Sequence, residues 1–119
     1  MSDNLKILIV DDNKEFCENI KDILELKNYN VDIANSGFEA LDIIKKNNYD
    51  VVLLDIKMPI MNGLETFKII KAINPKIIVI MLTAYAVEEL IRDSLREGAF
   101  GVLRKPIDFE KLFELIEKS

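Results

Sequence analysis

Charged side chains that could do chemistry stand directly after the short apolar runs of this sequence. Asp11 and Asp12 follow KILIV, Asp55 follows VVLL, and Lys105 follows GVLR. Carboxylates brought close together repel one another, by about 4 kcal/mol per pair at roughly 4 Å and an effective dielectric constant of about 20. Such a group must therefore spread apart, take up a proton or hold a cation. Carboxylate oxygens suit hard divalent ions, so we expect Mg²⁺, for which Mn²⁺ could substitute.

A lysine and a threonine extend this candidate site. Lys105 offers a positive charge to an anion bound beside the metal, and Thr83, which follows IIVIML, offers a hydroxyl donor. The implied ligand is a phosphoryl group. No Gly-rich phosphate cradle follows the first apolar run, so a covalent phosphoryl group on a carboxylate nucleophile is the alternative we favour. Asp55, at the end of an apolar run and opposite the acidic pair, is the best-placed nucleophile.

Each of these residues also has a simpler interpretation. Asp12 and Glu15 have the spacing of a helix capping box. Asp55 could be a turn residue, Thr83 a helix cap, and Lys105 a solvated charge at a strand end. Taken singly, these structural roles are at least as common as a functional one. The convergence of three carboxylates and one ammonium on one edge of a sheet favours function.

The elements that must position these residues alternate between short apolar runs and helical stripes. We predict strands over residues 6–10, 31–34, 51–54, 77–82 and 101–103, because each run is too short for an ordinary helix. Amphipathic stripes between and after the runs predict helices. This order predicts an α/β fold with a parallel sheet and helices on both faces. Ligands of such sheets bind beyond the carboxyl ends of the strands.

Helix starts are marked by residues that commonly form N-caps. The predicted caps are Ser36 with Glu39, Asn62 with Glu65, and Asp108. The residues Asn35 to Gly37, after the second predicted strand, indicate a turn and a helix cap and no further role.

Composition limits the function classes that remain. The 119 residues are half apolar, enough for the core of one domain, which we assign to residues 1–119. The net charge of -5 argues against direct binding to nucleic acid or an anionic membrane. No apolar run reaches the roughly 18 residues of a spanning helix, and MSDNLK does not resemble a secretion signal. We therefore expect a cytoplasmic protein.

Histidine and cysteine usage restricts the chemistry further. The chain has no histidine, which excludes imidazole bases and histidine metal ligands within it. The single cysteine, Cys17, cannot form an internal disulfide, which fits a reducing compartment. Its apolar helical context favours a small core residue over a nucleophile.

Four sequence segments together resemble the receiver domain of two-component response regulators, the CheY-like superfamily. They are LIVDD, LLDIKMPIMNG, LTAYA and EGAFGVLRKPID, which occur in order and at suitable spacings over essentially the whole chain. The resemblance implies a (βα)5 flavodoxin-like three-layer sandwich with a parallel five-stranded sheet of strand order 2-1-3-4-5.

The resemblance also implies roles for individual residues. Asp55 would be the phosphoacceptor and would receive its phosphoryl group from a phosphohistidine of a histidine kinase or histidine phosphotransfer protein. Asp12, Asp55 and the backbone carbonyl of Lys57 would bind Mg²⁺ directly, and Asp11 would act through water. Lys105 would pair with the acceptor and then with the phosphate, and Thr83 would hydrogen-bond a phosphate oxygen.

The same resemblance implies a cis peptide before Pro106 and a docking surface for the phosphodonor. That surface would include the first helix near Lys14, Cys17 and Lys21, together with the loop Pro106-Ile107. Lys57 and Tyr85 would border the phosphate and slow its hydrolysis.

Phosphorylation would draw Thr83 and the loop to Val87 inward and alter the face formed by the fourth helix, fifth strand and fifth helix. A downstream effector or a fused output domain would bind that face. One position departs from the family: Val102 stands where receivers usually carry Tyr or Phe. Phe100 is a candidate substitute, because strand alternation would put it on the same side as Val102.

The resemblance implies a signalling switch that is phosphorylated and is not itself an enzyme. Two other function classes remain as alternatives. A Mg²⁺-dependent phosphatase would pass the phosphoryl group to water, but such enzymes usually carry D-x-D, whereas here Asp11 and Asp12 are adjacent and Asn13 follows. A phosphorylation-independent interaction module would not need the complete acidic site.

Overall fold

The computed structural model describes residues 5–58, 60–84 and 88–119, apart from the side chain of Leu90. The described residues form one parallel sheet of order β2-β1-β3-β4-β5, so the predicted fold class and strand order are confirmed. The strands are β1 (Lys6–Val10), β2 (Asn30–Ala34), β3 (Val51–Asp55), β4 (Ile78–Thr83) and β5 (Gly101–Arg104). The predicted roles of Tyr85 and Val87 concern positions outside the described residues.

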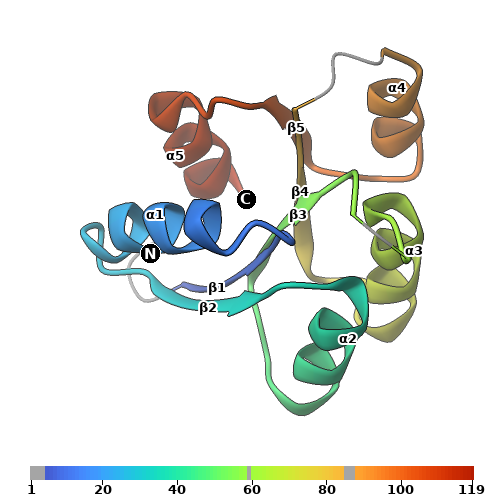
Figure 1. Ribbon diagram of the computed structural model, residues 1–119, viewed down its shortest axis with the longest axis horizontal. Coiled ribbons are helices and arrows are strands. Elements are labelled where there is room, and N and C mark those ends of the chain that lie inside the picture. The colour runs from blue at the N-terminus through green and yellow to red at the C-terminus, as the bar shows by residue number, and fades with distance from the viewer. Residues whose placement is uncertain (1–4, 59, 85–87) are drawn as a thin grey trace.

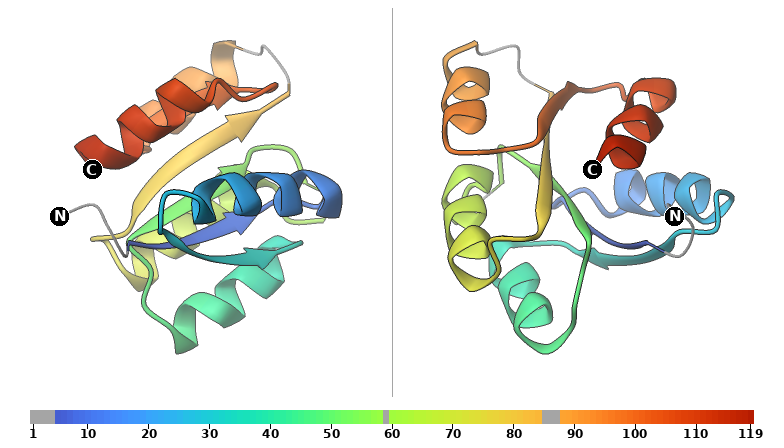
Figure 2. Two further views of the ribbon diagram at one scale, coloured as in Figure 1. Left: turned by 90° about the vertical axis from the view of Figure 1, so that its left-hand side faces the viewer. Right: turned by 180° about the vertical axis from the view of Figure 1, so that it is seen from behind.

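Helices cover both faces of the sheet, which gives three layers (Figure 1). α1 and α5 lie on one face and α2, α3 and α4 on the other (Figure 2). The helices are α1 (Lys14–Glu25), α2 (Gly37–Lys46), α3 (Gly63–Ile73), α4 (Glu88–Arg96) and α5 (Phe109–Lys118).

Strand alternation divides the core into two apolar clusters, one on each face of the sheet. In β1, Ile7 and Ile9 pack with α1 and α5, whereas Leu8 and Val10 pack on the side of α2 and α3. All five residues of β3 are buried, including Asp55. A strand covered on both faces holds its terminal side chain rigidly, because no residue before it can relax toward water.

The N-caps follow the sequence signals with one correction. Asn62 and Glu65 form a complete capping box, Ser36 accepts from the Glu39 N–H, and Asp108 caps α5. The capping role considered for Asp12 is wrong, because the α1 cap is Asn13, whose side chain accepts from Phe16.

No helix among the described residues is long and apolar enough to cross a membrane.

Candidate functional site

Three carboxylates meet at the carboxyl edge of the sheet. β1 pairs with β3 so that Val10 lies opposite Leu54, which brings Asp11 and Asp12 beside Asp55. One oxygen from each of the three carboxylates lies within 4.8 Å of the others. Asp11 and Asp55 are buried, whereas Asp12 is exposed. The strand order thus gathers the acidic residues that the sequence analysis selected.

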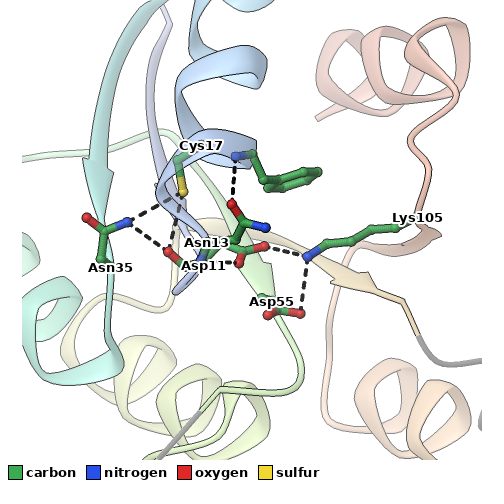
Figure 3. Close-up of polar contacts among 7 residues, drawn as sticks. Asp11, Asn13, Cys17, Asn35, Asp55 and Lys105 are labelled. Carbon is green, nitrogen blue, oxygen red and sulfur yellow. Dashed lines mark hydrogen bonds and ion pairs between the residues drawn. The ribbon is translucent and has the colours of Figure 1, made fainter.

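Lys105 points into this acidic cluster from the end of β5 (Figure 3). Its Nζ lies 2.5 Å from Asp11 Oδ2 and 3.8 Å from Asp55 Oδ1. The ammonium therefore hydrogen-bonds Asp11 and also forms a longer ion pair with Asp55, the pairing that the resemblance implied. The peptide bond from Lys105 to Pro106 is cis, as predicted.

Burial alters the acidity of Asp55. Desolvation, with a further contribution from the Asp11 charge, raises the pKa of Asp55 from 3.8 to about 6. Lys105 and a hydrogen bond from the backbone N–H of Lys57 act in the opposite direction. The carboxylate is consequently a stronger base than an exposed aspartate, while it is still largely ionised near neutral pH.

Asp11 is held by a network that the sequence analysis missed. Its Oδ1 accepts from the Asn13 N–H at 2.9 Å, and its backbone carbonyl accepts from Asn35 Nδ2 at 2.9 Å and from the Cys17 thiol at 3.4 Å (Figure 3). The sequence predicts only a turn at Asn35. Instead its side chain fastens the loop after β2 to the loop after β1.

Cys17 is fully buried, so its assignment to a docking surface is wrong, and the core role is confirmed. Its side chain faces the sheet because it lies on the apolar side of α1 with Ile20 and Leu24. Burial, then the Asp11 charge, raises the pKa of the thiol to about 12. The sulfur is therefore a protonated hydrogen-bond donor rather than a nucleophile or a metal ligand.

Gly63 allows α3 to begin directly against the backbone of Asp55. A Cβ at Gly63 would lie 2.0 Å from the carbonyl oxygen of Asp55, a distance that no side chain tolerates. The Gly63 N–H donates to the Ile56 carbonyl at 2.7 Å, which closes the loop. Lys57, in the same loop, has an exposed side chain.

Thr83 ends β4 and is buried, beside the start of the loop that carries Lys105. The Lys105 N–H donates to the Thr83 carbonyl at 2.8 Å, which couples the two strand ends. Thr83 is a strand residue, so the helix-cap alternative is wrong. Val102 packs against the apolar cluster on the α2 and α3 face, and Phe100, just before β5, is 39% exposed.

The donor set fits a hard divalent cation. Every acidic group of the cluster offers oxygen, and the only cysteine is protonated. Three carboxylates and one ammonium leave about two negative charges, which a divalent ion would balance.

Comparisons with known proteins identify the family of this chain. The response regulator receiver domain family matches residues 7–117. The transcriptional regulatory protein ZraR of Escherichia coli K12 is 42% identical over 117 residues, which cover 98% of this chain and 26% of ZraR. The sporulation initiation phosphotransferase F of Bacillus subtilis is 37% identical over 115 residues, 97% of this chain and 93% of that protein. The chain thus spans about a quarter of the length of the ZraR relatives.

Solved structures share the fold closely. A receiver domain protein from Clostridium thermocellum has a TM-score of 0.91 and 37% identity, covering 96% of this chain and 92% of that one. The response regulator TrrA of Thermotoga maritima, solved in complex with Mg²⁺-BeF, has a TM-score of 0.87 and 35% identity, covering 96% and 97%. With the family match over nearly all of its length, this chain belongs to the response regulator receiver domains of two-component systems.

Proposed function

We propose that Asp55 accepts a phosphoryl group from a phosphohistidine of a partner kinase or phosphotransfer protein. The observation that carries this proposal is the meeting of Asp55 with Asp11, Asp12 and Lys105 at one edge of the sheet. A nucleophile for phosphoryl transfer needs positive charge close by, because negative charge spreads over the phosphoryl oxygens in the transition state.

The transfer step conserves atoms and charge. An oxygen of the Asp55 carboxylate forms the new bond to phosphorus, while the bond from phosphorus to the donor imidazole nitrogen breaks. The imidazole, protonated on its other nitrogen, leaves with the bonding pair as a neutral group. In the metal-free protein the pKa of Asp55 is about 6, so its carboxylate is mainly ionised at neutral pH, as a nucleophile must be.

In this proposal Asp12, Asp55 and the backbone carbonyl of Lys57 would bind Mg²⁺ directly, and Asp11 would act through water. Mn²⁺ would substitute. The bound ion would neutralise the carboxylates and the incoming phosphoryl oxygens. The crystal structure of TrrA with Mg²⁺-BeF supports this assignment by similarity.

The phosphodonor would dock beside α1 and the loop after β5. Phe16, Ile20 and Ile23 of α1 and Ile107 and Phe109 beyond β5 line an apolar groove that also includes Lys105. An apolar groove next to the acceptor suits a helix of a partner histidine protein.

The phosphorylated domain would act as a switch. The added charge and acceptor oxygens would draw the Thr83 hydroxyl toward the phosphate and alter the face formed by α4, β5 and α5. A downstream effector or a fused output domain would respond to that face. We regard the domain as a signalling switch with slow loss of its phosphate rather than as an enzyme.

Labelling with acetyl phosphate tests the proposal. With Mg²⁺ present, intact mass should show one phosphoryl group per chain, and Asp55→Asn or excess chelator should abolish it. Asp42→Asn, a change of an exposed aspartate on α2, is the matched control and should label normally. Absence of labelling in the unaltered protein would favour an interaction module. Continued turnover of a phosphoester, dependent on Asp55, would favour a phosphatase.

A further inference from the structure

The ammonium of Lys105 has a third neighbour besides the two carboxylates. Its Nζ lies 4.2 Å from the centroid of the Phe16 ring, within the range of a cation–π contact. The Lys105 side chain is only 19% exposed. An aromatic face therefore covers part of the ammonium that water would otherwise solvate.

The backbone at Phe16 is fixed by the start of α1. The Phe16 N–H donates to the Asn13 side chain at 3.0 Å, and the Asn13 N–H in turn donates to Asp11. The ring position is thus tied to the same loop that carries the acidic pair. Lys105, in contrast, approaches from β5 on a flexible four-carbon side chain, as Figure 3 shows.

We propose that Phe16 is a positioning residue for Lys105, and this inference rests on the proposed phosphorylation of Asp55. The ring attracts the ammonium electrostatically and keeps it inside the pocket, 3.8 Å from Asp55 Oδ1. From there a displacement of about 1 Å brings Nζ to hydrogen-bond distance of Asp55 Oδ1, the oxygen beside which a phosphoryl group would lie. Without the ring, Lys105 would also populate conformations turned toward solvent, and fewer molecules would be ready for transfer.

A purely apolar role for Phe16 is the competing explanation, because the ring also lines the groove with Ile20 and Ile107. The electronic character of the ring distinguishes the cation–π role from the apolar role. Fluorine atoms withdraw electron density from the ring face and weaken its attraction for a cation, while shape and apolar contact change little. Labelling with a small phosphodonor excludes an effect on partner docking, because a small molecule does not need to dock in the groove.

The test is a fluorination series at Phe16: phenylalanine, 4-fluoro-, 3,5-difluoro- and 3,4,5-trifluorophenylalanine, incorporated at this one position. The rate of labelling by acetyl phosphate with Mg²⁺ should fall at each step, by about tenfold in total, which corresponds to the strength of a partly desolvated cation–π contact. The labelling rate of Phe16→Leu should fall at least as far. Phe16→Tyr keeps an aromatic ring face and should retain most of the labelling rate.

Phe113 supplies a matched control. Lys27 Nζ lies 4.8 Å from the centroid of the Phe113 ring. Phe113 therefore makes the same cation–π contact away from the acidic cluster. The same series at Phe113 should leave the labelling rate unchanged. A flat rate across the Phe16 series, or an equal fall in both series, would overturn the inference. Failure of the unaltered protein to label at Asp55 would instead overturn the proposed function.

Discussion

Replacing Asp55 by asparagine should stabilise the metal-free protein at neutral pH. Burial and the Asp11 charge raise the pKa of Asp55 from 3.8 to about 6. At about 1.36 kcal/mol per pKa unit, ionised Asp55 therefore lowers the free energy of unfolding by about 3 kcal/mol. Asparagine has nearly the same shape and no charge. The pKa of about 6 already includes the opposing attraction of Lys105, so we expect a net gain of about 3 kcal/mol.

The pH dependence of this gain has a definite sign. Below about pH 3 Asp55 is protonated in the folded and unfolded states, so the two proteins should be equally stable. Between about pH 4 and pH 6 the unfolded state ionises before the folded state, and the unaltered protein loses stability relative to Asp55→Asn. Above about pH 6 the difference should be constant.

Urea unfolding in excess chelator, followed by circular dichroism from about pH 3 to pH 8, measures this difference. Asp42→Asn is the control and should change the free energy of unfolding by less than about 0.5 kcal/mol at every pH, because Asp42 is exposed. Added Mg²⁺ should stabilise the unaltered protein more than Asp55→Asn, since ligand binding to the folded state adds stability. An Asp55→Asn protein no more stable than the unaltered one at pH 7 in chelator would refute the reasoning.

Three further changes test the surroundings of the site. Gly63→Ala should destabilise the fold by more than about 2 kcal/mol and slow labelling, because its Cβ would meet backbone at 2.0 Å; equal urea midpoints would contradict this. Ile60→Gly should raise the free energy of unfolding by about 0.5–1 kcal/mol, because Ile60 has φ 69° and is 91% exposed, and a loss of stability would argue against backbone strain. Iodoacetamide at about pH 8 should alkylate Cys17 at least 100-fold more slowly in the native than in the urea-unfolded protein, because the buried thiol has a pKa of about 12; similar rates would show that the thiol is accessible.

Much of the fold follows from the pattern of apolar residues. The predicted strands agree with β1 and β3 to within one residue, and the predicted run 77–82 is displaced by one residue from Ile78–Thr83. Strands buried on both faces produce continuous apolar runs, and amphipathic helices produce a period near 3.6, so both kinds of element leave a local signal. The strand order came from the resemblance, because no local signal says which strands pair.

The contacts that hold the site were harder to predict, since they join loops distant in sequence. Asn35 reaches the Asp11 carbonyl across 24 positions, and its neighbours Ser36 and Gly37 give the signal of an ordinary helix start. Asn13 rather than Asp12 caps α1, although both residue types cap well and only backbone geometry distinguishes them. Side-chain bonds to backbone groups of another loop leave no periodic signal in a sequence.

The same contacts give a physical reason to propose Asp55, rather than Asp11, as the nucleophile. Both oxygens of the Asp11 carboxylate are engaged: Oδ1 accepts from the Asn13 N–H and Oδ2 from Lys105. An oxygen that accepts a short charge-assisted hydrogen bond holds its electron pairs more tightly and is a weaker nucleophile. Asp55 Oδ1 lies 3.8 Å from Lys105, beyond hydrogen-bond range, and its pKa is raised. By binding Asp11 at rest, Lys105 leaves Asp55 Oδ1 outside hydrogen-bond range, and it would remain close enough to stabilise a phosphoryl group on Asp55.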